Sequence, residues 1–264
     1  MVEERVMVAK PTNVSLPTHL DLPDTDGLPM ENDFQPAQSW LLTTALTPVL
    51  DRLHPTGEYF VGHDVGIYWK QTDPPLNGCK APDWYYVPGA KPFPPGQYRR
   101  SFVMWQEELS PLIAIEFVSG DGEVEHNDTP GTGKFWVYRR GIRAGYYAIH
   151  EPLRPSLEVY KLDGTEYRRV DPNAAGVIPI PELGAALGHW RGRNENREMC
   201  WLRFFTPDGL LLPSLEERTK VAEDRIRRAT AELERAETEA RSNRAELDEL
   251  VAKLRAKGID PDSL

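Results

Sequence analysis

The amino-acid sequence predicts an α/β domain with a mixed central sheet flanked by helices, followed by one long helix resembling a coiled-coil strand. Helical and strand-like patterns alternate over residues 34–170, which is typical of a domain that packs helices against a sheet. The stretch 112–119, LIAIEFVS, is almost entirely apolar, as expected for a strand covered on both faces. From residue 215 to residue 257 proline and glycine are absent, which favours one uninterrupted helix.

These patterns divide the 264 residues into three parts. Residues 1–29 carry four prolines and are expected to form an extended lead-in. Residues 30–212 are expected to form the α/β domain. Residues 215–257 are expected to form the C-terminal helix, which Gly258 and Pro261 would end.

The domain is expected to begin with a helix over residues 34–53, because apolar side chains recur there at steps of three and four. Asp33 is the predicted N-cap, Pro36 suits the first turn, and Pro48 is a possible kink. Strand-like stretches follow, bounded by proline and glycine or rich in aromatic and β-branched residues: 58–69, 81–89, 101–105 and 112–119.

The second half of the domain is expected to start with a helix over residues 129–145, capped by Thr129 with Pro130 in its first turn. Two strands, 146–152 and 156–164, complete the pattern. The order helix, strands, helix, strand predicts an α/β or α+β fold with a mixed sheet.

Charge and composition exclude several classes of protein. The formal net charge of −10 argues against broad electrostatic attraction to nucleic acid. A local basic groove stays possible through Arg99 and Arg100, through Arg139, Arg140 and Arg143, or through Arg191, Arg193 and Arg197, although such groups are more often solvated surface. Two cysteines, no apolar leader and no apolar run of about 18 residues predict a cytoplasmic protein that does not enter a membrane.

The C-terminal helix carries a heptad pattern. The seam consists of Ile226, Ala229, Leu233, Ala236, Ala240, Asn243, Leu247, Leu250 and Leu254. Three alanines and one asparagine weaken this seam, so a weak or short coiled coil is expected. The pattern indicates a homodimer through residues 215–257 or capture of another partner; a lone helix folding back on its own domain is the alternative.

Two acidic residues lie within apolar surroundings. Glu116 sits inside the apolar run 112–119, and Asp83 is bracketed by Pro82 and Trp84. A buried carboxylate is costly unless it pairs with a cation, becomes protonated or binds a metal. If the two acids lie on adjacent strands, each raises the pKa of the other, and a hard cation such as Mg²⁺ would relieve that repulsion.

Four segments in this order resemble the Uma2 family, also called DUF820, of restriction-endonuclease-like proteins. They are APDWYYVP (81–88), PLIAIEFVSGDG (111–122), TPGTGKFWVYRRGIRAGYYAI (129–149) and LEVYKLDGTEY (157–167). The resemblance covers about residues 30–190. It implies a PD-(D/E)XK nuclease fold and a Mg²⁺- or Mn²⁺-dependent endonuclease that hydrolyses DNA.

The resemblance also implies roles for individual residues. Asp83 matches the motif aspartate and Glu116 the motif glutamate, and together they would hold the metal. Val118 stands where a simple E-x-K motif has lysine, so the lysine that orients the attacking water would be Lys134 on the following helix. Glu31 matches poorly with the acid on the first helix of such nucleases.

Other readings stay open. His63 and Asp64 are weaker candidates for a general-base pair or for metal ligands. The acidic loop 121–128 is expected to be a solvated flap over the site, or else to bind a cation. Glu116 and Lys134 would otherwise form a structural ion pair. The rival function is a catalytically inactive nuclease-like module that recruits partners through its C-terminal helix.

Overall fold

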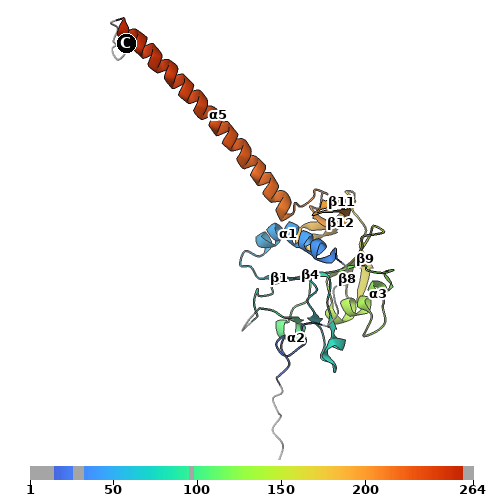
Figure 1. Ribbon diagram of the computed structural model, residues 1–264. Helices are drawn as coiled ribbons and strands as arrows, with labels where there is room; N and C mark the ends of the chain where they lie inside the picture. The colour runs from blue at the N-terminus through green and yellow to red at the C-terminus, as the bar shows by residue number, and fades with distance from the viewer. Residues whose placement is uncertain (1–14, 26–32, 95–97, 258–264) are drawn as a thin grey trace, which may run out of the picture. The chain divides into compact units, whose positions relative to one another are not determined.

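The computed structural model describes residues 15–25, 33–94 and 98–257 (Figure 1). The chain forms two units, residues 1–212 and 213–264, and each is described here by itself. The predicted lead-in 1–29 falls mostly outside the described residues, as do Glu31, Gly258 and Pro261. Across the described ranges, none of the helices combines the length and apolar character that crossing a membrane requires.

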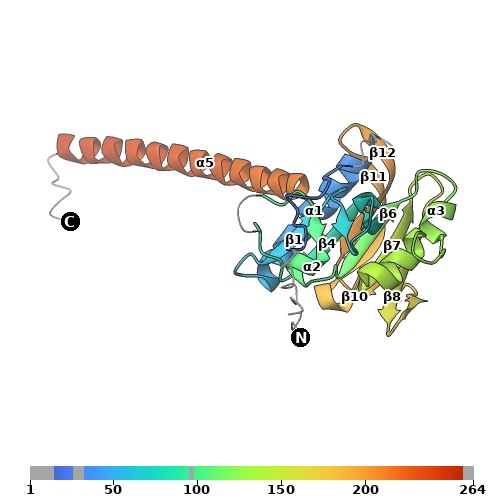
Figure 2. The same ribbon diagram turned by 90° about the horizontal axis from the view of Figure 1, so that it is seen from below.

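A six-stranded mixed sheet forms the centre of the first unit. Its order is β1-β4-β6-β7-β8-β9, and Figure 2 shows β4, β6, β7 and β8 following one another across the sheet. Strands β6 and β7 are parallel, whereas the other neighbours are antiparallel. The bounds are Tyr59–Gly62 (β1), Trp84–Pro88 (β4), Ile113–Phe117 (β6), Tyr146–Glu151 (β7), Ser156–Asp163 (β8) and Glu166–Arg169 (β9).

Two three-stranded sheets accompany the central one. The antiparallel sheet β10-β11-β12 comprises Ile178–Ile180, Ala185–Asn194 and Arg197–Phe205. The small sheet β3-β2-β5 comprises Cys79–Lys80, Ile67–Tyr68 and Phe102–Val103. The small sheet matters for the site because β3 leads directly into the segment before β4.

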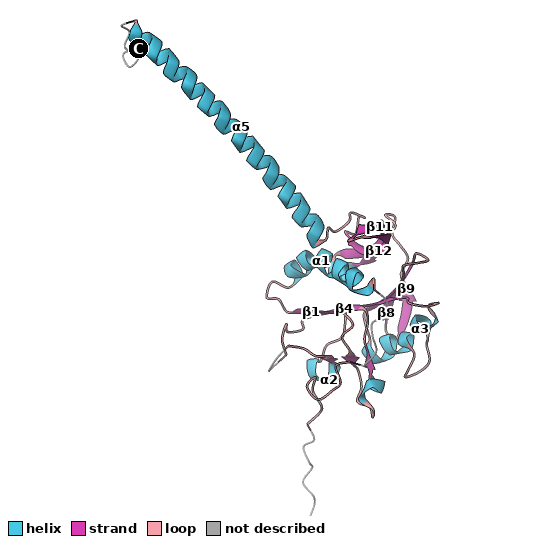
Figure 3. Cartoon of the chain, in the orientation of Figure 1, coloured by secondary structure: helices cyan, strands magenta, loops and turns pink. Residues whose placement is uncertain are grey.

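The helices are distributed along the chain as Figure 3 shows. In the first unit they are α1 (Gln35–Leu53), α2 (Met104–Glu107), α3 (Glu123–His126) and α4 (Lys134–Trp136), with short 3-10 turns at Pro75–Gly78 and Pro181–Leu183. Helix α4 continues as a π-helical turn over Val137–Ile142. The second unit contains α5, Leu215–Ala256.

The central sheet is covered on both faces, as the apolar run 112–119 predicted. Figure 1 views the sheet nearly edge-on, with α1, β11 and β12 on one side and α2 and α3 on the other. Ile113, Ile115 and Phe117 of β6 pack into the cluster that includes α1 and β12. Ala114 packs into the opposite cluster, and all five residues of β6 are buried. The predicted α/β class with a mixed sheet and a long C-terminal helix is confirmed.

Several element boundaries differ from those expected. Phe34, not Asp33, is the N-cap of α1, because the Asp33 carboxylate pairs with Arg197 of β12 at 3.1 Å. Pro36 lies in the first turn, as predicted. The stretch 58–69 is two strands of different sheets, since the chain turns at Asp64, whose backbone is left-handed (φ 53°).

The helix expected over residues 129–145 starts later. The Asn127 side chain accepts the Thr129 N–H at 2.8 Å, and the Thr129 carbonyl accepts the Gly133 N–H at 2.9 Å. This turn delays the helix to Lys134 and makes Gly133 its N-cap in place of Thr129. The strands β10, β11 and β12 were not predicted from the sequence.

Candidate active site

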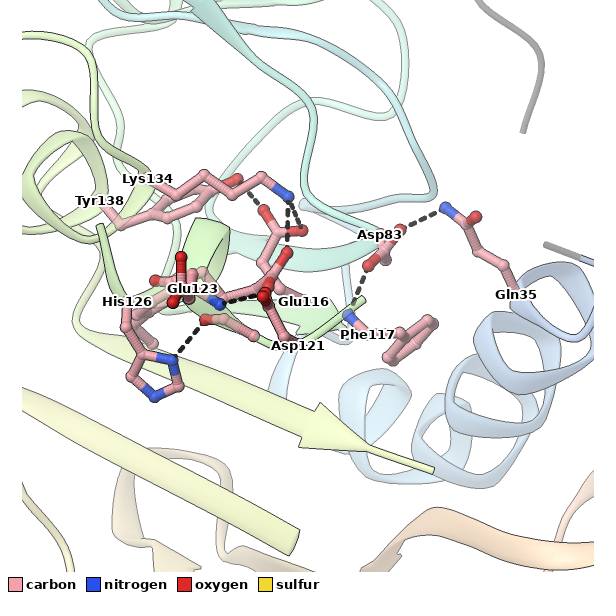
Figure 4. A network of polar contacts seen from close by, with 12 residues as sticks. Gln35, Asp83, Glu116, Phe117, Asp121, Glu123, His126, Lys134 and Tyr138 are labelled. Atoms are coloured by element: carbon pink, nitrogen blue, oxygen red, sulfur yellow. Dashed lines mark hydrogen bonds and ion pairs between the residues drawn. The ribbon is translucent and has the colours of Figure 1, made fainter. Parts of the chain in front are cut away.

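The pairing of β4 with β6 brings the two predicted carboxylates to one face of the sheet. Trp84 lies opposite Ile115 in this antiparallel pair. Asp83 precedes Trp84 and Glu116 follows Ile115, so these two occupy the next cross-strand position and face the same side. Figure 4 shows both carboxylates in one network of polar contacts.

Glu116 is almost completely buried, with 1% of its surface exposed. The Lys134 ammonium lies 3.0 Å from one carboxylate oxygen, and the Tyr138 hydroxyl donates to the other at 2.6 Å (Figure 4). A buried carboxylate is tolerated when a cation and hydrogen bonds compensate it. The ion pair considered from the sequence is therefore present, and it explains why a charged residue sits in this strand.

Lys134 binds a second carboxylate, Glu125 of α3, at 3.3 Å. Burial by itself lowers the pKa of the Lys134 ammonium, but Glu116 and Glu125 together raise it above its ordinary value. Lys134 therefore stays protonated and is held by two negative groups, which suits positioning rather than proton exchange.

Asp83 has hydrogen-bond donors but no directly bound cation among the described residues. Its carboxylate accepts hydrogen bonds from the Phe117 backbone N–H and from the Gln35 side chain (Figure 4). Burial, and then the charge of Glu116, raise the pKa of Asp83 to about 8, although the Phe117 N–H and Lys134 oppose that rise. At neutral pH Asp83 is therefore held mostly in its protonated, uncharged form.

The donor set fits a hard divalent cation. The described part of the chain contains no cluster of three or more His, Cys, Asp or Glu residues arranged as a metal cage. Mg²⁺, however, is commonly held by one or two carboxylates and keeps several waters. Asp83 and Glu116 supply two carboxylates, and a cation between them would relieve the repulsion from Glu116 that, after burial, raises the pKa of Asp83.

The two weaker candidates, His63 and Asp64, have different surroundings. The Asp64 N–H donates to the Pro82 carbonyl at 3.1 Å, and the negative charge of Asp64 also raises the pKa of Asp83. Asp64 therefore lies beside the site. The His63 ring contacts the Thr43 hydroxyl at 2.7 Å, and burial lowers the pKa of His63.

Three residues of the network were not assigned to the site from the sequence. Tyr138 received no role from the sequence, although a tyrosine one turn after Lys134 was a usable signal. Gln35 is the first residue of α1, and its side chain donates to Asp83, so it reaches the site from the first helix of the domain. Glu125 was assigned to a solvated flap, which is wrong because α3 buries it (4% exposed) against Lys134.

The arginines considered for a basic groove are largely neutralised. Arg139 pairs with Asp128 at 2.8 Å and with Glu166 at 2.7 Å, and Arg140 also pairs with Glu166. Other ion pairs of this set join Arg99 to Glu107, Arg100 to Asp24, and Arg197 to Asp33. Arg143, Arg191 and Arg193 make no ion pair with the described residues and stay available to attract a polyanion.

Comparison with known proteins identifies a family for this chain. The model of the family named Uma2, described as "Putative restriction endonuclease", matches residues 28–193. No curated protein matches the chain. The matched range contains Gln35, Asp83, Glu116, Glu125 and Lys134 and ends before α5.

Proposed function

The chain belongs to the Uma2 family, and from this premise we propose that it is a metal-dependent endonuclease that hydrolyses phosphodiester bonds of DNA. The observation that carries the proposal is the position of two carboxylates, the buried Glu116 and the partly buried Asp83, on one face of the sheet next to a lysine that two acids hold in place. Membership of the family supports the nuclease class, and the metal and the DNA substrate are the proposed details.

Each residue of the site would have a separate role in hydrolysis. Asp83 and Glu116 would hold Mg²⁺ or Mn²⁺, which when bound lowers the pKa of a coordinated water and stabilises charge on the scissile phosphate. Lys134 donates to Glu116 and so fixes the orientation of that carboxylate. Its charge is also available to orient the attacking water and to stabilise negative charge that develops on the phosphate.

Two further groups preorganise Asp83. The Phe117 N–H and the Gln35 amide donate to its two oxygens, which fixes the rotation of the carboxylate before any ligand arrives. The Tyr138 hydroxyl likewise fixes the Glu116 carboxylate, by donating to the oxygen that Lys134 does not contact. Ligands held by such hydrogen bonds need little reorganisation when a cation binds.

Cleavage of a supercoiled plasmid tests the proposal. The purified protein is expected to convert supercoiled DNA to nicked and linear forms with Mg²⁺ or Mn²⁺, and to leave it intact with EDTA. A wild-type protein that binds DNA but cleaves neither DNA nor RNA with any divalent cation would instead favour the inactive binding module.

We propose further that α5 binds a second copy of itself. None of its described side chains is buried, although Ile226, Leu233 and Leu247 are each more than half exposed along one stripe. Ser214 caps the helix through a reciprocal pair of hydrogen bonds with Glu217. A cap fixes where the helix starts, but a 42-residue helix with an open apolar stripe gains most stability from a partner.

The charges beside the stripe favour a parallel, in-register pair. In that arrangement Arg218 meets Glu223 of the second copy, and Glu239 meets Arg244 of the second copy. One like-charged contact remains, between Glu232 and Glu237. The parallel register also places every seam residue, including Asn243, opposite its own counterpart.

A full-length antiparallel pair is less favourable. With Leu254 opposite Ala222, Arg225 would face Lys253 and Glu232 would face Glu246. Glu239 would face its own copy, so every such charged pair would be repulsive. Shifting the two helices to avoid these contacts leaves the last leucines of the seam without partners.

The molar mass of the full chain tests this pairing. Wild type is expected to scatter light as a dimer, and Leu233→Glu as a monomer, because the substitution places a charge in the seam. Ala231→Glu, two residues away on the outer face, is the matched control and is expected to remain dimeric. A monomeric wild type, or equal masses for Leu233→Glu and wild type, would contradict the proposal.

A further inference from the structure

Lys80 occupies a position that the sequence did not single out. It lies on β3 opposite Ile67 of β2, which in turn lies beside Phe102 of β5. Neighbours in such a cross-strand row direct their side chains to the same face of a sheet. Ile67 and Phe102 pack into the cluster that contains Ala114 and Tyr138, which is the cluster on the Glu116 side of the central sheet.

The neighbouring row of the same small sheet faces the other way. Tyr68 and Val103 pack with Leu22 in a separate cluster, with Cys79 and Trp105 against it. The alternation of β3 therefore sends Cys79 away from the candidate site and Lys80 toward it.

The chain between Lys80 and Asp83 is short and fixed. Only Ala81 and Pro82 separate them, Pro82 is buried, and its carbonyl accepts the Asp64 N–H. Burial lowers the pKa of Lys80; the positive charge of Lys134 lowers it further, and Glu116 raises it. The Lys80 ammonium is therefore close enough to Lys134 and Glu116 for their charges to shift its pKa.

Lys80 nevertheless makes no ion pair with any described side chain. This distinguishes it from Lys134, which two carboxylates hold. A half-buried ammonium without a counterion is costly, and an anion arriving beside it would remove that cost. The ammonium thus has the properties of a binding group for a phosphate rather than of a structural ion pair.

We propose that Lys80 is a second lysine of the site and that its ammonium binds a non-bridging oxygen of the scissile phosphate. Lys134 then positions Glu116, while Lys80 contacts the substrate itself. The inference deepens the proposed nuclease function and rests on it for the cleavage step, whereas the contact with DNA phosphate can be measured without cleavage.

Two measurements test the proposal on the full chain. The first is the affinity for a short fluorescent DNA duplex in Ca²⁺, followed by anisotropy, because Ca²⁺ commonly permits binding without cleavage in metal-dependent nucleases. Lys80→Met is expected to weaken binding about 5-fold or more, and Lys80→Arg to retain most of it, because Arg also binds phosphate. Lys70→Met is the matched control, since Lys70 lies over the Trp69 ring and is expected to be neutral.

The second measurement is the single-turnover cleavage rate with Mn²⁺, which is expected to fall about 30-fold in Lys80→Met. Unfolding midpoints confirm that the variants are folded. If wild type cleaves nothing, the proposed function fails and the binding experiment alone decides the role of Lys80. Equal affinity for DNA in Lys80→Met and wild type, an equal loss in Lys70→Met, or no binding of DNA by wild type would each overturn the proposal.

Discussion

Replacing Asp83 with alanine is expected to reduce the Mn²⁺-dependent single-turnover rate of DNA cleavage by about 10³-fold. The carboxylate supplies one of two proposed ligands, and stabilisation of phosphate charge by a bound metal contributes several kcal/mol to the barrier. Loss of Asp83 also leaves Glu116 as the one remaining proposed metal ligand on this face of the sheet. The rate is measured with enzyme in excess over a labelled duplex, so that product release does not contribute.

Asp83→Asn removes the charge of the side chain but keeps its shape, so it shows which of the two the reaction needs. The asparagine oxygen can accept the Phe117 N–H, and its NH2 group can donate to Gln35 if the Gln35 amide turns over, so both contacts can be replaced while the negative charge is removed. This variant is expected to fold normally and to be nearly as slow as Asp83→Ala. Asp163→Asn removes an exposed acid that pairs only with Arg168 and should cleave at the wild-type rate. Cleavage by Asp83→Asn at the wild-type rate would contradict the assigned role.

Replacing Lys134 with methionine is expected to lower the free energy of unfolding by about 3 kcal/mol. The substitution leaves both Glu116 and Glu125 buried without their cation, and removing one partner of a buried pair is strongly destabilising. Urea unfolding followed by fluorescence, at neutral pH and without added metal, measures the change.

The control for this prediction is Lys161→Met. Lys161 pairs with Glu182 at 2.9 Å, but both side chains are more than 40% exposed, so the loss should stay below about 1 kcal/mol. An equal loss of stability in the two variants would show that Lys134 makes no special contribution to the buried cluster.

The sequence predicts the parts of the fold that local patterns determine. The apolar run around Glu116, the helix starting near residue 34 and the strands that carry Asp83 and Tyr146 all follow from periodicity and from flanking proline or glycine. The order of the motifs was enough to recognise the family, because it preserves the chain order of strand, strand and helix.

Features set by distant contacts were beyond the sequence. Whether Asp33 caps α1 depends on Arg197, which lies 164 residues away and draws its carboxylate elsewhere. The sheet β10-β11-β12 packs together with α1 on one face of the central sheet, and Leu202 exchanges hydrogen bonds with the buried Gln38 side chain. Such long-range pairs leave no local periodicity in the sequence.

The candidate site likewise contains residues that local sequence patterns identify and residues that only distant contacts reveal. Asp83, Glu116 and Lys134 were chosen because acids within apolar segments and a lysine on the next helix have a local signature. Gln35 and Lys80 have no such local signature. Gln35 matters because the first turn of α1 lies beside the start of β4, and Lys80 matters because of the direction in which the two-residue strand β3 points its side chain. Polar residues on short elements become interpretable only when the register of the sheets is known.

The proposed function requires Asp83 and Glu116 to hold one cation together, and calorimetric titration with Mn²⁺ at pH 7 tests this directly. Wild type is expected to bind one Mn²⁺ and to release a proton, since the pKa of Asp83 is about 8 and only the ionised carboxylate is a ligand. Affinity should therefore rise as the pH increases toward 8, and Asp83→Asn should bind at least about 10-fold more weakly without that proton release. Equal affinity and equal proton release in wild type and Asp83→Asn would contradict the account.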